Sequence, residues 1–306
     1  NPEIRERVLA CAREHEFQPN VMAQSLVGSK THLIGVVVTD IGNAFFADLV
    51  KHIEQAAGQA GYSMILFNSG YDRDHEKECL DVVRRYRVDG LIVVPVEAES
   101  AQWKEQVAKL EIPAVVITRK ASGMDSFYVD HAEAGAQAAR HLCEQEYEEF
   151  LFLGNTADEK YIGFEQILKE LRKGVSTHLT VITAKDTEQV RDALERHFSK
   201  HQGPTGIFAY NDRRAVQVLG LLEQMRIRIP EEAGVVGFDN TYMCEYLYPK
   251  LSSIAQPNQK MAELAVTRLL ERLEHPEETK KLDHPLHAEL ICRESSDRVG
   301  RKENEK

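Results

Sequence analysis

The stretch Gly206–Asn240 reads GIFAYNDRRAVQVLGLLEQMRIRIPEEAGVVGFDN, and the rest of the chain is interpreted from it. Two apolar runs, Gly206–Tyr210 and Gly234–Phe238, flank an amphipathic segment that we predict as a helix. Such runs are typical of parallel strands buried on both faces. Each run ends in polar residues, Asn211–Asp212 and Asp239–Asn240, and parallel sheets bind ligands at the carboxyl ends of their strands. Because no phosphate-binding loop or nucleophile motif accompanies them, the sequence indicates a binding cleft rather than a reaction centre.

The alternation of strand and helix continues on both sides of this stretch. Nine further strands are predicted, at Leu33–Thr39, Tyr62–Phe67, Leu91–Val94, Pro113–Thr118, Tyr128–Val129, Phe150–Leu153, Leu179–Thr183, Ser252–Ala255 and His287–Cys292. Amphipathic helical patterns separate most of them, and residues 1–16 also have helical periodicity. The pattern restarts after Val129, so the sequence predicts an α/β fold with two doubly wound parallel-sheet lobes and a short helical segment at the start.

Composition limits the possible functions. The 306 residues are enough for two domains, and a net charge of -11 argues against strong nucleic-acid binding by this chain itself. Five scattered cysteines without a Cys-x-x-Cys pair, and twelve histidines without a pattern, indicate neither a metal site nor a disulfide framework. We therefore expect a reduced, cytoplasmic setting. The chain starts at Asn1 within a helical pattern, so we expect that an upstream portion is absent.

A series of short motifs resembles, in order and spacing, the LacI/GalR family of bacterial transcription regulators. The motifs are Pro19-Asn20, Ala23-Gln24-Ser25-Leu26, Leu33–Val38, Asn43–Ala47, Arg87–Ile92, Val129-Asp130-His131, Gly163-Phe164, Tyr210-Asn211-Asp212, Ile229-Pro230-Glu231, Val236–Asn240 and Leu251–Pro257. Each is weak alone, but their order covers nearly the whole chain. The resemblance implies two periplasmic-binding-protein-like lobes around an effector cleft.

The resemblance also implies domain boundaries. The chain is expected to cross between lobes near His131, Gln256 and Asp283. The expected divisions are 1–17 as a remnant of the helix-turn-helix head, 18–30 as hinge helix and linker, 31–131 plus 257–282 as N-terminal lobe, 132–256 plus 283–300 as C-terminal lobe, and 301–306 as tail. In the hinge, Asn20, Ala23 and Leu26 match positions that contact DNA, Leu26 as the wedge into a minor-groove step.

Residues at the strand ends are the candidate effector ligands. The resemblance assigns Asn211 and Asp239 to effector hydroxyls; the alternative is that they cap helices or form turns, as we expect for Asp212. It places Phe46 against the ligand, although this ring could equally belong to the core. A further group follows the same logic, with turn formation as the alternative for its first two members: Thr39, Asp40 and Gln256.

The cations near the cleft indicate an acidic effector. Thr118 stands where the family often has an aspartate that binds effector, and Arg119 beside it can grip a carboxylate or phosphate, or form a rim salt bridge. Lys160 replaces a family arginine and keeps the charge without the bidentate fork, and Lys185 can add another cation. We therefore predict a sugar, a sugar acid or a sugar phosphate as effector.

The sequence thus predicts the sensor and dimerisation core of a ligand-responsive, DNA-binding regulator, most simply a repressor, acting as a homodimer on operator DNA. The resemblance places the dimer surface near Phe45–Ala60 and Asp72–Tyr86. No catalytic residue, cofactor or membrane contact is predicted. Two alternatives stand: a transport-type sugar-binding protein, which needs an export signal and lacks a hinge, and a small α/β enzyme, which needs a nucleophile or cofactor loop.

Overall fold

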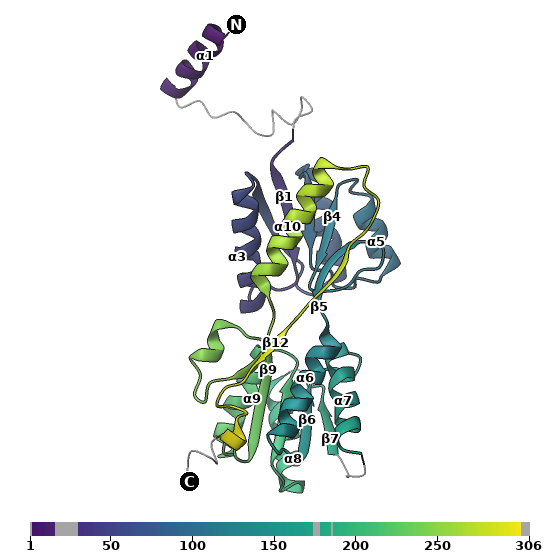
Figure 1. The fold of residues 1–306 in the computed structure, drawn as a ribbon, viewed down its shortest axis with the longest axis vertical. Coiled ribbons are helices and arrows are strands. Elements are labelled where there is room, and N and C mark those ends of the chain that lie inside the picture. Colours follow the sequence, from purple (N-terminus) through teal and green to yellow (C-terminus); the bar gives the residue numbers. More distant parts are fainter. Residues whose placement is uncertain (1, 16–29, 174–177, 185, 301–306) are drawn as a thin grey trace.

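The computed structural model describes residues 2–15, 30–173, 178–184 and 186–300, and they form two α/β lobes one above the other (Figure 1). The first sheet has the strand order β11-β5-β4-β3-β1-β2, and the second has the order β12-β10-β9-β8-β6-β7. All described pairs are parallel except β10 with β12. The predicted fold class, two doubly wound parallel-sheet lobes, is confirmed.

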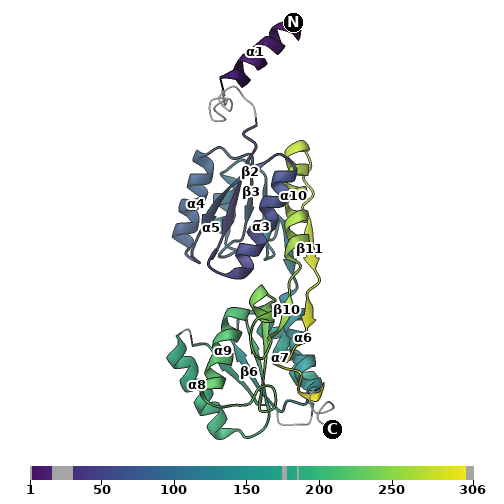
Figure 2. The ribbon, with the colours of Figure 1, turned by 90° about the vertical axis from the view of Figure 1, so that its left-hand side faces the viewer.

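The first lobe contains these elements: β1 (Leu33–Val38), α3 (Ala44–Gln59), β2 (Ser63–Asn68), α4 (Arg73–Arg85), β3 (Gly90–Val93), α5 (Ala101–Ala108), β4 (Ala114–Ile117), β5 (Asp125–Val129), α10 (Asn258–Glu274) and β11 (Asp283–Leu286). Helices α3 and α10 cover one face of its sheet, and α4 and α5 cover the other (Figure 2). The central strands β1, β3 and β4 consist almost entirely of buried apolar residues, because both faces of the sheet are covered.

The second lobe contains α6 (His131–Glu144), β6 (Glu149–Leu153), α7 (Glu159–Leu171), β7 (His178–Ile182), α8 (Thr187–Lys200), β8 (Thr205–Ala209), α9 (Asp212–Gln224), β9 (Ala233–Asp239), η1 (Tyr242–Glu245), β10 (Ser252–Ala255) and β12 (Glu289–Ile291). Helices α6 and α7 lie on one face, and α8 and α9 on the other (Figure 2). A separate helix, α1 (Pro2–Glu14), precedes the lobes.

Three connections join the lobes: β5 to α6, β10 to α10, and β11 to β12 (Figure 1). The third differs from the expectation. Residues 283–286 pair with β5 in the first sheet, so the chain crosses after Leu286 and not near Asp283. Within the predicted segment His287–Cys292, only Glu289–Ile291 forms a strand, and the strand β11 lies before the segment. An extended chain that leaves one sheet and joins another pairs on both sides of the crossing. One cluster of buried apolar residues contains side chains of both lobes, including Ile34 of the first and Ile254 of the second.

Two glycines set the spacing between α6 and α7. A Cβ on Gly135 would overlap the carbonyl oxygen of Lys160, and one on Gly163 would overlap the carbonyl oxygen of Ala132. The two helices therefore touch backbone to backbone, which fixes Lys160 at the start of α7. Within the described ranges, no helix is long and apolar enough to cross a membrane.

Candidate functional site

A cavity of about 130 Å³ lies between the lobes, at the carboxyl ends of the strands of both sheets. Eight of the nine predicted effector residues line it: Thr39, Phe46, Thr118, Arg119, Lys160, Asn211, Asp239 and Gln256. The first four come from the first lobe, the next three come from the second lobe, and Gln256 lies at the second crossing between the lobes. In each sheet the cavity adjoins the point where strand order reverses, between β1 and β3 and between β6 and β8. That crevice is where open α/β sheets bind ligands.

Asp40 is the ninth residue, and it lies outside the cavity lining. Its Oδ1 accepts a hydrogen bond of 3.0 Å from Gly42 N, which forms the turn before α3. Its Oδ2 lies 3.5 Å from Nη1 of Arg213 on α9. Asp40 therefore forms a turn, as the alternative held, and also joins the two lobes at the cleft edge.

The centre of the second-lobe wall is a hydrogen bond of 2.7 Å from Gln256 Nε2 to Asp239 Oδ1. Burial raises the pKa of the Asp239 carboxyl well above its usual range, and the neighbouring carboxylate of Asp212 raises it further. The charge of Lys160 and the hydrogen bond from Gln256 lower this pKa, but by less. One buried oxygen at the cavity, Gln256 Oε1, has no hydrogen-bond partner among the described residues, and the Thr39 hydroxyl has only the Tyr71 hydroxyl as its neighbour. Such orphaned groups are costly in a folded protein unless a ligand or water satisfies them.

The ammonium group of Lys160 is held by other residues of the second lobe. Its Nζ donates to the carbonyl oxygen of Tyr210 over 3.1 Å and lies 4.2 Å from the centroid of the Phe238 ring. Burial lowers the pKa of Lys160, although the carboxylates of Asp158 and Asp239 oppose the shift. The ammonium is therefore a fixed part of the cavity wall rather than a mobile cation.

Asn211 caps a helix and also lines the cavity. It is the N-cap of α9, because its Oδ1 accepts a hydrogen bond of 3.0 Å from Arg214 N. The expectation that Asp212 caps the helix is wrong. Asp212 is buried and accepts from Thr241 N and Ser253 Oγ over 2.6 and 2.5 Å. It fixes the loop after β9, while Asn211 keeps its amide Nδ2 for the cavity.

Three residues that line the cavity have a positive φ. Thr118 has a φ of 66°, Tyr71 one of 59° and Asp239 one of 111°. A β-branched residue such as Thr118 rarely adopts a positive φ, and strain of this kind clusters at ligand sites. The exposed side chain of Arg119 follows Thr118 and has no ion-pair partner among the described residues, so the alternative of a rim salt bridge does not hold there.

Aromatic side chains make the apolar part of the wall. Phe46 and Phe45 are both buried and pack edge to face, with ring centroids 5.0 Å apart, and both line the cavity. Phe46 therefore belongs to the core and to the cavity at once. Seven other lining residues were not predicted as effector ligands: Asn43, Tyr71, Val94, His131, Asp158, Tyr210 and Phe238. Tyr210 and Phe238 end predicted strands, so the strand-end rule could have found them; Tyr71 and His131 gave no such signal.

His131 begins α6 at the first crossing, where its ring packs edge to face on Phe238 at 5.5 Å. Burial lowers the pKa of His131 well below its usual value, and the charges of Lys160 and Arg119 lower it further. The ring is therefore neutral near pH 7. The described lining contains no serine or cysteine, and the described residues contain no cluster of three metal-ligating side chains. The cavity offers donors, acceptors and ring faces, which suit binding.

Several proteins similar to this chain are transcription regulators. A family model described as a periplasmic binding protein-like domain matches residues 139–296. The HTH-type transcriptional regulator DegA of Bacillus subtilis is 30% identical over 266 residues, which cover 84% of this chain and 79% of that protein. The chain belongs to the LacI family of transcriptional regulators.

Other LacI-family comparisons extend over more of the chain. The transcriptional repressor PurR of Vibrio vulnificus is 26% identical and matches 96% of this chain and 90% of its own length. The solved structure of a LacI family regulator from Enterococcus faecalis with bound ribose is 31% identical, with a TM-score of 0.75 and coverage of 87% and 99%. These relatives are regulators rather than transport proteins, so this chain contains a LacI-type regulator core. The hinge residues Asn20, Ala23 and Leu26, and Lys185, lie outside the described residues.

Proposed function

We propose that this regulator core responds to a sugar-like effector, bound between the lobes by the eight cavity residues named above. The unsatisfied oxygen of Gln256 carries the proposal, because Gln256 lines a cavity that already has aromatic walls. A volume of about 130 Å³ has room for about four waters, which suits one sugar ring. Two solved relatives support a pentose: the E. faecalis regulator holds ribose, and one from Alkaliphilus metalliredigens, 26% identical with a TM-score of 0.75, holds D-xylulofuranose.

In this proposal, Arg119 binds an acidic group of the effector. Lys160 is occupied by the Tyr210 carbonyl, whereas Arg119 has no ion-pair partner among the described side chains and reaches the cavity from the first lobe. Its planar fork suits a carboxylate or phosphate. A sugar acid or sugar phosphate is therefore expected to bind more tightly than the matching neutral sugar.

Titration calorimetry with ribose, xylose, their aldonic acids and their phosphates tests the proposal. Binding of any of these supports a sugar sensor. Arg119→Gln is expected to weaken an acidic ligand by about 10-fold or more, since hydrogen bonds to charged groups contribute roughly 1.5–3 kcal/mol, and to leave a neutral sugar unchanged. Arg85→Gln on the exposed side of α4 is the control. A neutral sugar that binds far better than its acid contradicts the acidic effector, and no binding by either class contradicts the sugar sensor.

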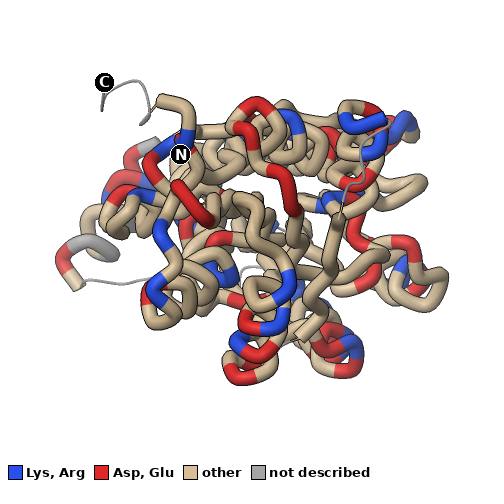
Figure 3. Tube along the Cα trace, turned by 90° about the horizontal axis from the view of Figure 1, so that it is seen from below, with Lys and Arg blue, Asp and Glu red and all other residues tan. Residues whose placement is uncertain are grey.

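We further propose that the full protein is a cytoplasmic repressor that binds operator DNA as a homodimer. The chain carries a net charge of -11, and its basic and acidic residues are interspersed (Figure 3). DNA contact is therefore assigned to the head and to residues 18–30. The dimer surface is proposed on α3 and α4 of the first lobe. Within the described chain, an exposed aromatic patch on the second lobe, Tyr242, Tyr246 and Tyr248, adds apolar area that a second copy can cover.

Sedimentation of the chain at tens of micromolar tests the homodimer. A dimer that Tyr246→Lys weakens supports the use of the aromatic patch. Leu171→Lys, at an exposed apolar position at the end of α7 and away from both proposed surfaces, is the control. A monomer at all concentrations contradicts the homodimer. Catalysis is not expected, so recovered sugar should be chemically unchanged after prolonged incubation with the protein.

A further inference from the structure

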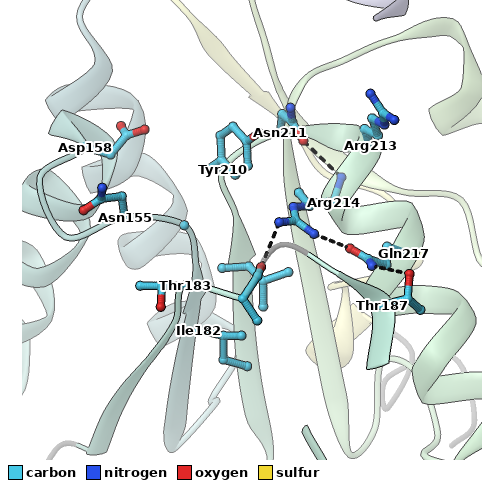
Figure 4. Close-up of a pocket in the computed structure, with 13 residues that line it drawn as sticks. Asn155, Asp158, Ile182, Thr183, Thr187, Tyr210, Asn211, Arg213, Arg214 and Gln217 are labelled. Atoms are coloured by element: carbon cyan, nitrogen blue, oxygen red, sulfur yellow. Dashed lines mark hydrogen bonds between the residues drawn. The ribbon is translucent and has the colours of Figure 1, made fainter. Parts of the chain in front are cut away.

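A cavity of about 370 Å³ in the first lobe lies apart from the effector cleft. The cavity of about 740 Å³ on the second lobe shares Asp158, Tyr210 and Asn211 with the interlobe cavity, so it belongs to that cleft (Figure 4). The first-lobe cavity shares no lining residue with either of these. We call it the linker pocket, and its lining is Lys30, Val83, Arg84, Arg87, Val88, Asp89, Leu110, Ile112 and Leu273.

The linker pocket lies at the amino-terminal edge of the first sheet, whereas the effector cavity lies at the carboxyl edge. Val88 and Asp89 come directly before β3, and Ile112 comes before β4. The chain enters the lobe at this same edge, because β1 begins at Leu33 (Figure 1). Lys30, the last residue of the expected hinge and linker, is part of the lining. The pocket shares only the last turn of α4 with the proposed dimer surface.

Apolar side chains form the inner part of the pocket. Val83, Val88 and Leu110 are buried and belong to one core cluster, and Ile112 and Leu273 are half-buried. Small-molecule sites are typically lined in this way, with a mostly apolar wall and a few polar groups that fix the orientation of the ligand. An inorganic anion has no apolar surface to cover such a wall, so the pocket suits an organic molecule.

Cations line the outer part of the pocket. They are Lys30, Arg84 and Arg87, all of them exposed. None of the three forms an ion pair with another residue in the described part of the chain. The one carboxylate in the described lining, Asp89, is engaged with the backbone of the linker. Positive charge is therefore in excess, and the planar guanidinium groups suit a carboxylate or a phosphate group.

Asp89 fixes the end of the linker to the wall of the pocket. Its Oδ1 accepts hydrogen bonds from Thr31 N over 2.9 Å and from Thr31 Oγ1 over 2.8 Å. Its Oδ2 accepts from His32 N over 2.9 Å. Lys30 is the next residue toward the hinge, so these bonds hold it at the pocket. An anion that bonds to Lys30 and to either arginine would add a second tie between the linker and the first lobe.

We propose that the linker pocket binds a small organic anion, which consists of an alkyl or aryl body and one carboxylate or phosphate group. The body covers the apolar wall, and the acidic group bonds to Lys30, Arg84 and Arg87. Such a ligand acts on the linker from the edge opposite the effector. In the full protein, the ligand and operator DNA are then expected to alter each other's affinity. The site does not depend on which effector binds between the lobes.

Calorimetry with matched probes tests the proposal. 1-Naphthoate, octanoate and 1-naphthyl phosphate carry both the body and the acidic group. 1-Naphthamide and octanamide lack the charge, whereas acetate and inorganic phosphate lack the body. Arg84→Gln removes one cation of the pocket, and Arg85→Gln is the matched control. Both arginines are exposed in the last turn of α4, so both variants lose the same favourable charge at the helix end, but only Arg84 lines the pocket.

At least one organic anion is expected to bind about 10-fold or more tightly than its amide and than acetate or phosphate, because hydrogen bonds to charged groups are the stronger ones. Arg84→Gln should weaken that binding by about 10-fold, and Arg85→Gln should change it by less than about 2-fold. Melting temperatures confirm that both variants fold. No binding by any probe, equal binding of the amide, or equal losses in the two variants overturns the proposal, and sugar binding is unaffected in each case.

Hydrogen exchange tests the tie to the linker. The amides of Thr31 and His32 both donate to Asp89, so a bound organic anion should slow their exchange. The amide of Gly42, which donates to Asp40 at the opposite edge of the sheet, is the control and should not change. Slower exchange at Thr31 and His32 that Arg84→Gln abolishes supports the proposal. Unchanged exchange while 1-naphthoate or octanoate is bound overturns the action on the linker.

Discussion

Gln256 and Asp239 form a hydrogen bond of 2.7 Å that joins the end of β9 to the second crossing between the lobes. The two residues lie on neighbouring strands, because Ala255 pairs with Asp239 in the parallel register of β10 and β9. Gln256 Oε1 remains buried without a described partner. A ligand that satisfies this oxygen therefore acts directly on a segment that carries the chain from one lobe into the other.

Replacement of Gln256 tests this relationship. Gln256→Ala removes the amide oxygen from the cavity, so effector affinity is expected to fall by about 2- to 10-fold, since a hydrogen bond between neutral groups is worth roughly 0.5–1.5 kcal/mol. Gln259→Ala is the control, because Gln259 bonds the exposed Glu263 one turn into α10. Equal affinities for the two variants, measured by calorimetry, would show that Gln256 does not contact the effector.

The raised pKa of Asp239 predicts a pH-dependent stability. The unfolded carboxyl has a pKa of about 3.9, and burial raises it in the folded state. The folded protein keeps the proton on Asp239 up to a higher pH than the unfolded chain does. The free energy of unfolding therefore falls as pH rises from the unfolded-state pKa through the folded-state pKa, and it stays lower above that pH.

Asp239→Asn removes this penalty. The variant should melt higher than the natural chain at pH 8, by about 2–4 °C for each kcal/mol, and the difference should disappear toward pH 4. Sugar affinity should fall at the same time. Asp81→Asn on the exposed side of α4 is the control. A difference in melting temperature that is constant from pH 4 to pH 8 would exclude titration of Asp239 as the cause.

The strand-end residues could be predicted because geometry constrains them. Thr39, Asn211 and Asp239 end strands of parallel sheets, and those ends converge on one edge whatever the helices do. The same reasoning could not place residues whose side-chain direction depends on the backbone conformation of a loop. Tyr71 reaches the cavity through a φ of 59° in a loop, and no side-chain pattern encodes that conformation.

Other features depend on contacts between distant segments. The sequence predicted both Arg119 and Lys160 as effector ligands and separated them only by the bidentate fork that Lys160 lacks. Lys160 is instead held by the Tyr210 carbonyl, 50 residues away, because close packing of α7 on α6 fixes its position. Pairing of residues 283–286 with β5 was missed for the same reason: an edge strand of four residues, two of them half-buried, carries a weak pattern.

The glycine contact between α6 and α7 predicts opposite effects for two glycine substitutions. Gly163→Ala drives a Cβ into the carbonyl oxygen of Ala132, so the helices must separate and Lys160 must move. Overpacking of this kind costs about 1–3 kcal/mol or more. Gly220→Ala on the exposed side of α9 meets nothing within 4 Å and should stabilise by about 0.5–1 kcal/mol. Chemical denaturation measures both. Two changes of the same sign would refute backbone contact between the helices.

The ion pair between Asp40 and Arg213 predicts a salt-dependent effect on effector binding. The two charges lie 3.5 Å apart on opposite lobes and close the cavity edge. Because both side chains are partly exposed, the pair is worth about 0.2–1 kcal/mol. Arg213→Glu replaces attraction by repulsion and favours separation of the lobes, so affinity should fall by about 2- to 10-fold at low salt and by less at 0.5 M salt.

The reversed pair, Asp40→Arg with Arg213→Asp, should restore part of the affinity that the single variant loses, because the attraction between the lobes returns although the turn bond from Gly42 N to Asp40 is lost. Arg228→Glu is the control, because Arg228 pairs with Glu232 inside the second lobe, 3.2 Å away, and its loss leaves the lobes' contact intact. Calorimetry at both salt concentrations separates the cases. If the reversed pair binds as weakly as Arg213→Glu, the residues act on the ligand or on the fold individually, and the ion pair does not hold the lobes together.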